Sequence, residues 1–92
     1  MNNEISPAYL AMLLKNAAEL GALTALIRTG KIKPYVNKSE SFRLYTRKNI
    51  ESWIKSGLIT PRKDGDHSAA WRIDRIEAEA VSKSQKSLHF FY

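Results

Sequence analysis

Two phrases of the chain repeat nearly the same order of residues and constrain where helices and strands can lie. "IRTGKIKP" spans residues 27–34, and "IKSGLITP" spans residues 54–61. In each phrase an amphipathic segment ends in glycine, which adopts positive φ at a helix end at little cost. Each phrase then reaches a proline, which a sheet tolerates at the beginning or edge of a strand. The chain is therefore expected to end a helix and begin a strand twice.

The first thirty residues predict two helices. Ser6 followed by Pro7 is typical of a helix start, with serine as the N-cap and proline in the first turn. Apolar residues then recur at steps of three and four as far as Leu20. Gly21 interrupts the pattern, and a second apolar face continues to Gly30.

The next segment predicts a β-hairpin. The β-prone runs "IKPYV" (32–36) and "FRLY" (42–45) flank the turn-rich "NKSES". Alternation along the second run would direct Phe42 and Leu44 to the core and Arg43 and Tyr45 to the other side.

A third helix and a second hairpin follow. Thr46 can cap a helix that buries Ile50 and Trp53 and that ends at Gly57. "LITPR" (58–62) and "AAWRI" (69–73) then flank an Asp64-Gly65 turn. Asp74 and Glu77 have the spacing of a capping box and predict a fourth helix, with Trp71 facing the core.

The predicted fold class is α+β, mostly helical, in the order helix, helix, hairpin, helix, hairpin, helix. Residues 1–92 are expected to form one domain. Within it, residues 6–57 hold the first two helices, the first hairpin and the third helix. Residues 58–86 hold the second hairpin and the fourth helix, and residues 87–92 form an apolar tail.

Positive charge is concentrated in the middle of the chain. Residues 28–63 hold ten Lys and Arg against two acids, a formal charge of +8 in a chain whose total is +6. The remaining residues therefore carry −2. Segregation of this kind in a small domain favours a polyanionic partner over a merely solvated surface.

Composition excludes several other classes. The chain has no cysteine, which removes disulfides and thiolate chemistry. His67 and His89 lack metal-ligand spacing, so we expect no metal site. The sequence also has no glycine-rich phosphate loop and no grouping of catalytic residues, so we expect no cofactor and no enzymatic activity. The start resembles no signal peptide, and the apolar run 8–14 is shorter than a membrane span. We therefore expect a cytoplasmic protein with no membrane partner.

The first two predicted helices have the spacing of a helix-turn-helix. Ala17, Gly21 and Ile27 would supply the close approach, the turn and the aliphatic contact of that motif. The stretch "LTALIRTGKIKPYVNKSESFRLYTRKNIESWIKSG" resembles the DNA-binding unit of excisionase-type winged helix proteins of the MerR superfamily. The resemblance lies in "LIRTGKI", in the Arg-x-Tyr of "FRLYTR" and in "NIESWI". It covers residues 10–57 closely and residues 58–86 more loosely.

The resemblance implies a set of DNA-contacting residues. The second helix would enter the major groove, with Thr24 and Arg28 placed for polar contact, and the first hairpin would follow the adjacent backbone. Arg43 and Tyr45 would contact the backbone, and the second hairpin would do so at corresponding positions. The implied set is Thr24, Arg28, Lys31, Lys33, Tyr35, Lys38, Arg43, Tyr45, Arg47, Lys48, Arg62, Lys63 and Arg72.

Some of these residues have structural alternatives. Thr24 can be a plain surface residue, and Tyr45 can be a partly buried packing ring. Arg47 and Lys48 lie in the first turn of the third predicted helix, where the positive helix dipole disfavours cations. A nearby phosphate would resolve that conflict, because helix N-termini bind anions.

The leading functional hypothesis is sequence-dependent binding of double-stranded DNA. The protein would act as an excisionase-like recombination directionality factor or as a small transcriptional regulator. The expected partners are duplex DNA, a recombinase or integrase, and further copies of the chain on DNA. The alternative is a protein-interaction adaptor, encoded by a phage or mobile element, that uses the apolar tail from Leu88 to Tyr92. Packing of this tail onto the first helix is the other interpretation of its apolar residues. RNA binding is disfavoured because the aromatic residues are expected in the core.

Overall fold

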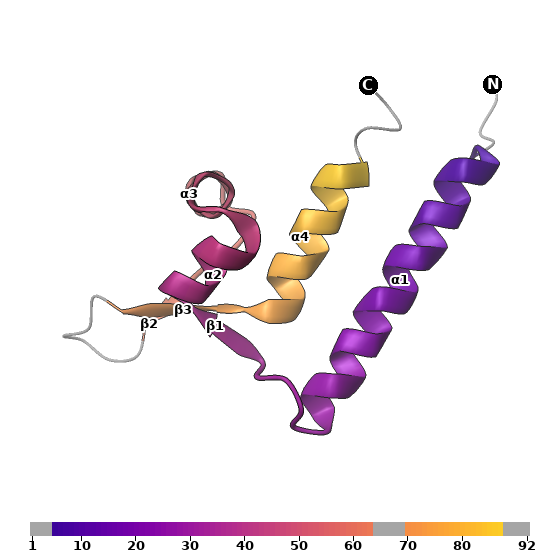
Figure 1. The fold of residues 1–92 in the computed structure, drawn as a ribbon. Helices are drawn as coiled ribbons and strands as arrows, with labels where there is room; N and C mark the ends of the chain where they lie inside the picture. The colour runs from indigo at the N-terminus through magenta and orange to yellow at the C-terminus, as the bar shows by residue number, and fades with distance from the viewer. Residues whose placement is uncertain (1–4, 64–69, 88–92) are drawn as a thin grey trace.

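The computed structural model describes residues 5–63 and 70–87. Its elements follow the order α1 (Pro7–Arg28), β1 (Tyr35–Asn37), α2 (Lys38–Tyr45), α3 (Arg47–Lys55), β2 (Arg62–Lys63), β3 (Trp71–Asp74) and α4 (Arg75–Ser87). The protein is α+β and mostly helical, as predicted, with a small antiparallel sheet (Figure 1). The order of the elements differs from the prediction in its first half.

The first two predicted helices are one continuous helix. The predicted start is confirmed, because the Tyr9 N–H donates to Ser6 Oγ at 3.1 Å and Pro7 opens the first turn. The predicted break at Gly21 is wrong, since α1 runs through it to Arg28. A single glycine costs a helix only about 1 kcal/mol relative to alanine. The good helix formers on both sides outweigh that cost, so residues 7–28 contain no helix-turn-helix.

The two repeated phrases form the same helix ending. After α1, Gly30 has φ 76° and donates to Ile27 O, and Lys31 donates to Leu26 O. After α3, Gly57 has φ 80° and donates to Ile54 O, and Leu58 donates to Trp53 O. Both are Schellman motifs, which satisfy the last carbonyls of a helix. Pro34 and Pro61 come shortly before β1 and β2, so the predicted sequence of helix, glycine and strand is confirmed twice.

The first predicted hairpin is wrong in its second strand. Residues 38–45 form α2, whose N-cap is Asn37; its side chain accepts from the Glu40 N–H at 2.8 Å. Asn37 and Glu40 have the spacing of a capping box, a helix signal within the stretch interpreted as a turn. The helix changes the directions of the side chains. Leu44 is exposed, whereas Tyr45 is buried.

The second hairpin and the last helix are confirmed. β2 pairs with β3 antiparallel, and β3 pairs on its other edge with β1, giving the order β1-β3-β2. At the start of α4 the Asp74 carboxylate accepts from the Glu77 N–H at 2.9 Å. The Glu77 side chain turns elsewhere and accepts from the Thr60 N–H at 3.2 Å. The predicted Asp64-Gly65 turn and the tail from Leu88 to Tyr92 lie outside the described residues.

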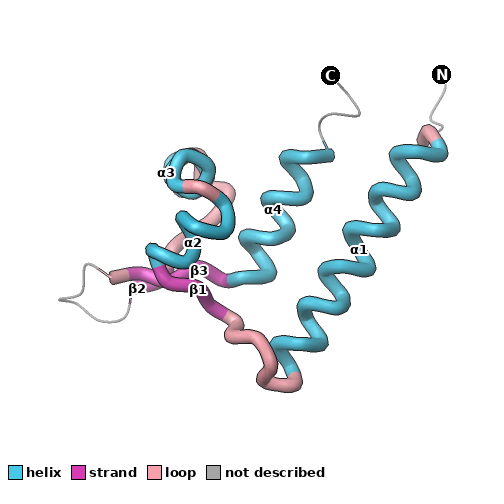
Figure 2. The backbone as a smooth tube through the Cα atoms, viewed as in Figure 1, coloured by secondary structure: helices cyan, strands magenta, loops and turns pink. Residues whose placement is uncertain are grey.

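The core lies between the sheet, α2, α3 and α4. Val36 and Ile73 are paired across β1 and β3, so their side chains share the inner face of the sheet. The helices α2 and α3 lie over that face, and α4 continues from the end of β3 (Figure 2). The buried apolar residues are Val36, Tyr45, Ile50, Trp53, Ile59, Ile73 and Ala78.

Helix α1 contributes no buried residue to this core. It runs beside α4 on the far side of the molecule from α3 (Figure 1). Lys83 of α4 forms an ion pair with Glu19 of α1, and this contact lowers the pKa of the Glu19 carboxyl. Within the described part of the chain, α1 is also the one helix long and apolar enough to cross a membrane by length and composition.

Candidate nucleic-acid interface

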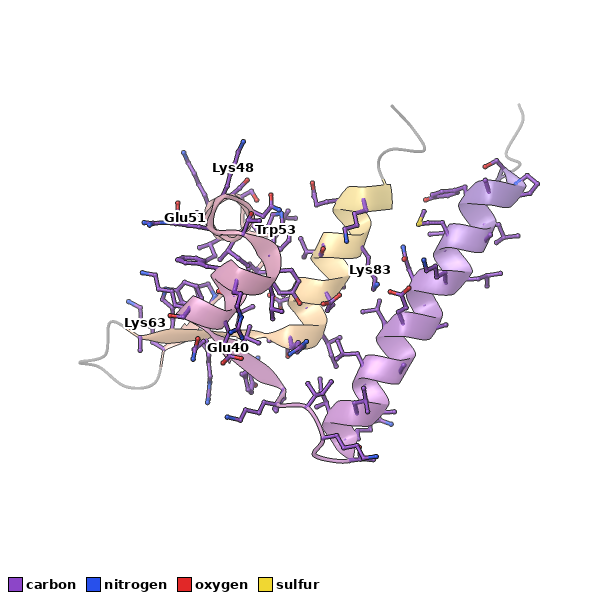
Figure 3. The ribbon with its side chains drawn as sticks, in the orientation of Figure 1. Glu40, Lys48, Glu51, Trp53, Lys63 and Lys83 are labelled. Carbon is purple, nitrogen blue, oxygen red and sulfur yellow. The ribbon has the colours of Figure 1, made fainter. Side chains whose placement is uncertain are left out.

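Helix α3 has one buried face and one polar face. Thr46 caps it as predicted, its Oγ1 accepting from the Asn49 N–H at 3.2 Å. Ile50 and Trp53, at 0% and 5% exposure, fix the inner face. The outer face is exposed and consists of Arg47, Lys48, Glu51, Ser52 and Lys55. In Figure 3, Lys48 and Glu51 point away from the fold, so this face is open to a partner.

The joint between α2 and α3 is a single residue. Thr46 has φ 72° and ψ 147°, a region that β-branched residues rarely occupy. It also separates the last residue of α2 from the first residue of α3. The chain therefore turns sharply here. Figure 1 shows α3 end-on, whereas α2 runs across the view.

One acid on the polar face pairs with a base. Arg47 Nε lies 2.7 Å from Glu51 Oε1, one helical turn away, and both side chains are largely exposed. This hydrogen bond and charge raise the pKa of the Arg47 guanidinium. The pair reduces the net charge of the first turn of α3. Lys48 and Lys55 are the other bases on this face.

Basic side chains lie on aromatic rings between α2 and the sheet. Phe42 and Trp71 meet edge to face, with ring centroids 6.1 Å apart. Lys38 Nζ lies 5.9 Å from both centroids, and Arg47 Cζ lies 5.7 Å from that of Phe42. Cations at such distances from ring faces are attracted by the ring quadrupole. The two bases are thereby held next to the N-terminus of α2 and the first turn of α3.

The outer face of the sheet carries a second basic group. Asn37, Arg72 and Arg62 lie side by side across β1, β3 and β2. Arg72 Cζ lies 4.5 Å from the ring centroid of Tyr35, and Arg62 Cζ lies 5.7 Å from it. Arg62 Nη1 also donates to the Tyr35 hydroxyl at 3.1 Å. A single tyrosine thus positions two guanidinium groups, which can bind phosphate oxygens in bidentate fashion.

The structure divides the predicted contact set. The α2–α3 and sheet region holds Tyr35, Lys38, Arg43, Arg47, Lys48, Arg62, Lys63 and Arg72, but Tyr35, Arg62 and Arg72 lie on the outer face of the sheet, opposite the face that α2 and α3 cover. Thr24 and Arg28 lie on α1 instead, and Lys31 and Lys33 lie in the segment between α1 and β1. Thr24 is half-buried and its hydroxyl donates to Leu20 O at 2.8 Å. The predicted placement of Thr24 and Arg28 on the second helix of a helix-turn-helix is therefore wrong.

The predicted exposure of Tyr45 is also wrong. Its side chain is 7% exposed, and its hydroxyl donates to Glu79 Oε1 of α4 at 2.8 Å. The centroid of the Tyr45 ring lies 5.9 Å from the centroid of the Trp53 ring. Tyr45 therefore packs in the core, which was the structural alternative to a DNA contact. Arg43, its predicted partner, is exposed on α2.

Two exposed residues of α3 were missed by the sequence reasoning. Ser52 follows Lys48 by four residues and Lys55 follows Ser52 by three, so all three share the outer face of the helix. Helical periodicity alone could have found them, because placing Ile50 and Trp53 in the core puts Lys48, Ser52 and Lys55 on the opposite side.

Comparisons of the chain with protein-family models, with curated proteins and with solved structures found no match. The resemblance to excisionase-type proteins therefore stays a prediction. In residues 5–63 and 70–87, no three His, Cys, Asp or Glu side chains are grouped as a metal site would need. The surface just described is mainly basic, with Glu51 as the one acid on the exposed face of α3.

Proposed function

We propose that the protein binds double-stranded DNA through α2, α3 and the β2–β3 hairpin. In this proposal α2 and α3 act as the two helices of a helix-turn-helix, and the hairpin acts as its wing. The winged helix arrangement is thus retained, but its helices are residues 38–55 rather than residues 7–29. The supporting observation is α3 itself, a short helix whose exposed face holds three bases, one serine and one acid, and which is followed in the chain by a basic hairpin.

The parts of this surface would have different roles. Helix α3 is narrow enough to enter the major groove, where Lys48, Ser52 and Lys55 would reach base edges or phosphates. Lys63, on the face of the sheet that α2 and α3 cover, would contact the adjacent sugar-phosphate backbone and fix the position of α3. Arg62 and Arg72, on the opposite face, would contact the backbone only around the edge of the hairpin. Figure 1 shows α3 and the hairpin on the side of the molecule away from α1, so α1 does not stand between them and a duplex.

The biological role that suits this surface is architectural or regulatory. A domain of 92 residues whose contacts are mainly electrostatic binds duplexes broadly and gains specificity from groove shape and a few bases. Such a domain would direct a recombination complex as an excisionase does, or would block a promoter. Both roles require binding rather than catalysis.

The test measures the affinity of variants that each lack one basic side chain, by fluorescence anisotropy of a labelled duplex at several salt concentrations. Lys48→Ala on α3 and Lys63→Ala on β2 each remove one exposed base, and Lys86→Ala on α4 is the matched control. We expect each of the first two to weaken binding and to reduce the salt slope by about one. Lys86→Ala should match the wild type. A control that weakens binding as much as Lys48→Ala would place the contact surface elsewhere.

A further inference from the structure

An apolar strip runs along the outward side of α1 and has no partner within the described chain. The helix positions that face α4 are half-buried, whereas the opposite side is exposed. One strip of that exposed side, here named the outer α1 face, consists of Leu10, Leu14, Ala17, Ala18, Gly21 and Ala25, and the exposed Lys15 and Glu19 lie beside it. The side chains of Leu10 and Leu14 are 46% and 63% exposed. A helix with apolar residues on all sides is normally buried, in a protein core or in a membrane.

Helix α1 exposes apolar side chains along its length. None of its residues is buried, and Leu10, Leu14 and Leu26 are 46%, 63% and 37% exposed. Contact with a second copy would remove this apolar surface from water, which is favourable in proportion to the area removed.

We propose that two copies of this chain associate through their outer α1 faces, with the two α1 helices antiparallel. The large residues Leu10 and Leu14 lie in the N-terminal half of the face, and the small residues Gly21 and Ala25 lie in its C-terminal half. A two-fold axis between Ala17 and Ala18 places Leu14 of one copy against Gly21 of the other. A Cβ built on Gly21 meets nothing within 4 Å, so space for a leucine side chain exists there.

The charges of α1 agree with this arrangement. Lys15 and Glu19 lie to one side of the outer α1 face, and Arg28 is the last residue of the helix, beyond the end of that face. Lys83 reaches from α4 toward α1 (Figure 3) and pairs with Glu19, which also lies 4.0 Å from Lys15. The outer α1 face itself carries no charge. Two copies can therefore meet without burying an unpaired ion.

A second copy fits this face better than a lipid bilayer does. α1 is long enough to cross a membrane, but Lys15 and Glu19 lie near its middle. Ionisable side chains at that depth are costly in a bilayer. Insertion would also separate Glu19 from Lys83 and remove α4 from its place beside α1. A dimer preserves both contacts and leaves the proposed DNA surface uncovered.

Sedimentation velocity of the full chain without detergent measures the oligomeric state. The wild type should sediment as a dimer of about 21 kDa, twice the chain mass. Leu14→Glu places two like charges in the interface and should raise the dimer Kd at least about a hundredfold. Leu44→Glu is the matched control, because Leu44 is 43% exposed on α2. A monomeric wild type at 100 µM, or a dimeric Leu14→Glu variant, would refute the proposal.

Cysteine cross-linking tests the antiparallel orientation, since the chain has no cysteine of its own. Oxidised Ala17→Cys or Ala18→Cys should form a covalent dimer. Leu10→Cys should not, because antiparallel pairing separates the two sites by about 22 Å along the helices. Cross-linking at Leu10→Cys would show a parallel pair instead. Binding of a monomeric chain to phosphatidylcholine vesicles would show that lipid, rather than a second copy, covers this face.

Discussion

Replacing Tyr45 by phenylalanine removes one oxygen atom and leaves the aromatic ring in place. The ring of Tyr45 packs against Trp53 of α3, and its hydroxyl donates to Glu79 of α4 at 2.8 Å. The residue therefore links α2 to both neighbouring helices. A hydrogen bond to a charged acceptor contributes about 1.5–3 kcal/mol. Glu79 is half-buried, so water can replace part of that bond, and we expect Tyr45→Phe to lower the unfolding free energy by about 1–2 kcal/mol.

The pH dependence of stability provides a second readout for the same variant. Burial and then the hydrogen bond to Glu79 raise the pKa of the Tyr45 phenol well above its usual value near 10. Because the folded-state pKa is raised, the protonated phenol favours the folded state, and this contribution to stability is fully present below pH 10. It is lost progressively as the pH rises from 10 toward the folded-state pKa. At pH 11, ionisation of Tyr45 in the unfolded chain costs about 1.4 kcal/mol of stability. Tyr45→Phe lacks this loss, so the difference between the two proteins should nearly vanish at pH 11.

Urea denaturation followed by circular dichroism at pH 8 and pH 11 measures both effects. Tyr35→Phe is the control, because the Tyr35 hydroxyl makes its contact with Arg62 at the surface; it should change stability by less than about 0.5 kcal/mol. Folded Tyr45→Phe should also bind DNA as the wild type does. Equal stability of Tyr45→Phe and wild type at pH 8, or a constant difference up to pH 11, would refute the role assigned to this hydroxyl.

Three further changes test the local structure. Thr46→Gly should raise the unfolding free energy by about 1 kcal/mol, because relief of the strain at φ 72° exceeds the loss of the cap; a lower urea midpoint would contradict the joint described here. Gly57→Ala should lower it by about 1 kcal/mol, since alanine disfavours φ 80° although its Cβ would meet no atom; an unchanged midpoint would argue against the Schellman ending. Ile50→Ala should lower it by about 3 kcal/mol, because Ile50 is fully buried. A loss below 1 kcal/mol in calorimetry would place Ile50 outside the core.

The parts of the fold that depend on local chemistry were predictable. Ser6, Thr46 and Asp74 each cap the helix that the sequence assigned to them. Gly30 and Gly57 end their helices because each supplies positive φ within a few residues of the last turn. Caps and stops involve only neighbouring residues, so the sequence contains the whole signal.

Residues 38–45 show where local reasoning failed. "FRLY" alternates with a period of two and contains aromatics, which favours a strand. The capping-box spacing from Asn37 to Glu40 favours a helix, and packing of Tyr45 against Trp53 and Glu79 stabilises it. Glu79 lies 34 residues from Tyr45 in the sequence, so no local pattern reveals their contact.

The candidate site was predictable in composition but not in arrangement. The excess of Lys and Arg between residues 28 and 63 predicted a basic surface. The register of the sheet decides which bases meet, since it places Arg72 beside Arg62 and both on Tyr35. β1 pairs with β3 across more than thirty residues, whereas the sequence suggested that it pairs with the next segment. Arg28 and Lys31 were therefore grouped with bases from which the fold separates them.

The most direct test of DNA binding through α3 and the hairpin is an NMR titration. A short duplex would be added to the ¹⁵N-labelled full chain at 50 mM salt, and changes in amide shifts would be mapped onto the structure. The largest changes should fall on α3, on Arg62 and Lys63, and on Arg72. Residues 8–25 of α1 should keep their shifts. Changes centred on α1, or none anywhere at saturating duplex, would contradict the account.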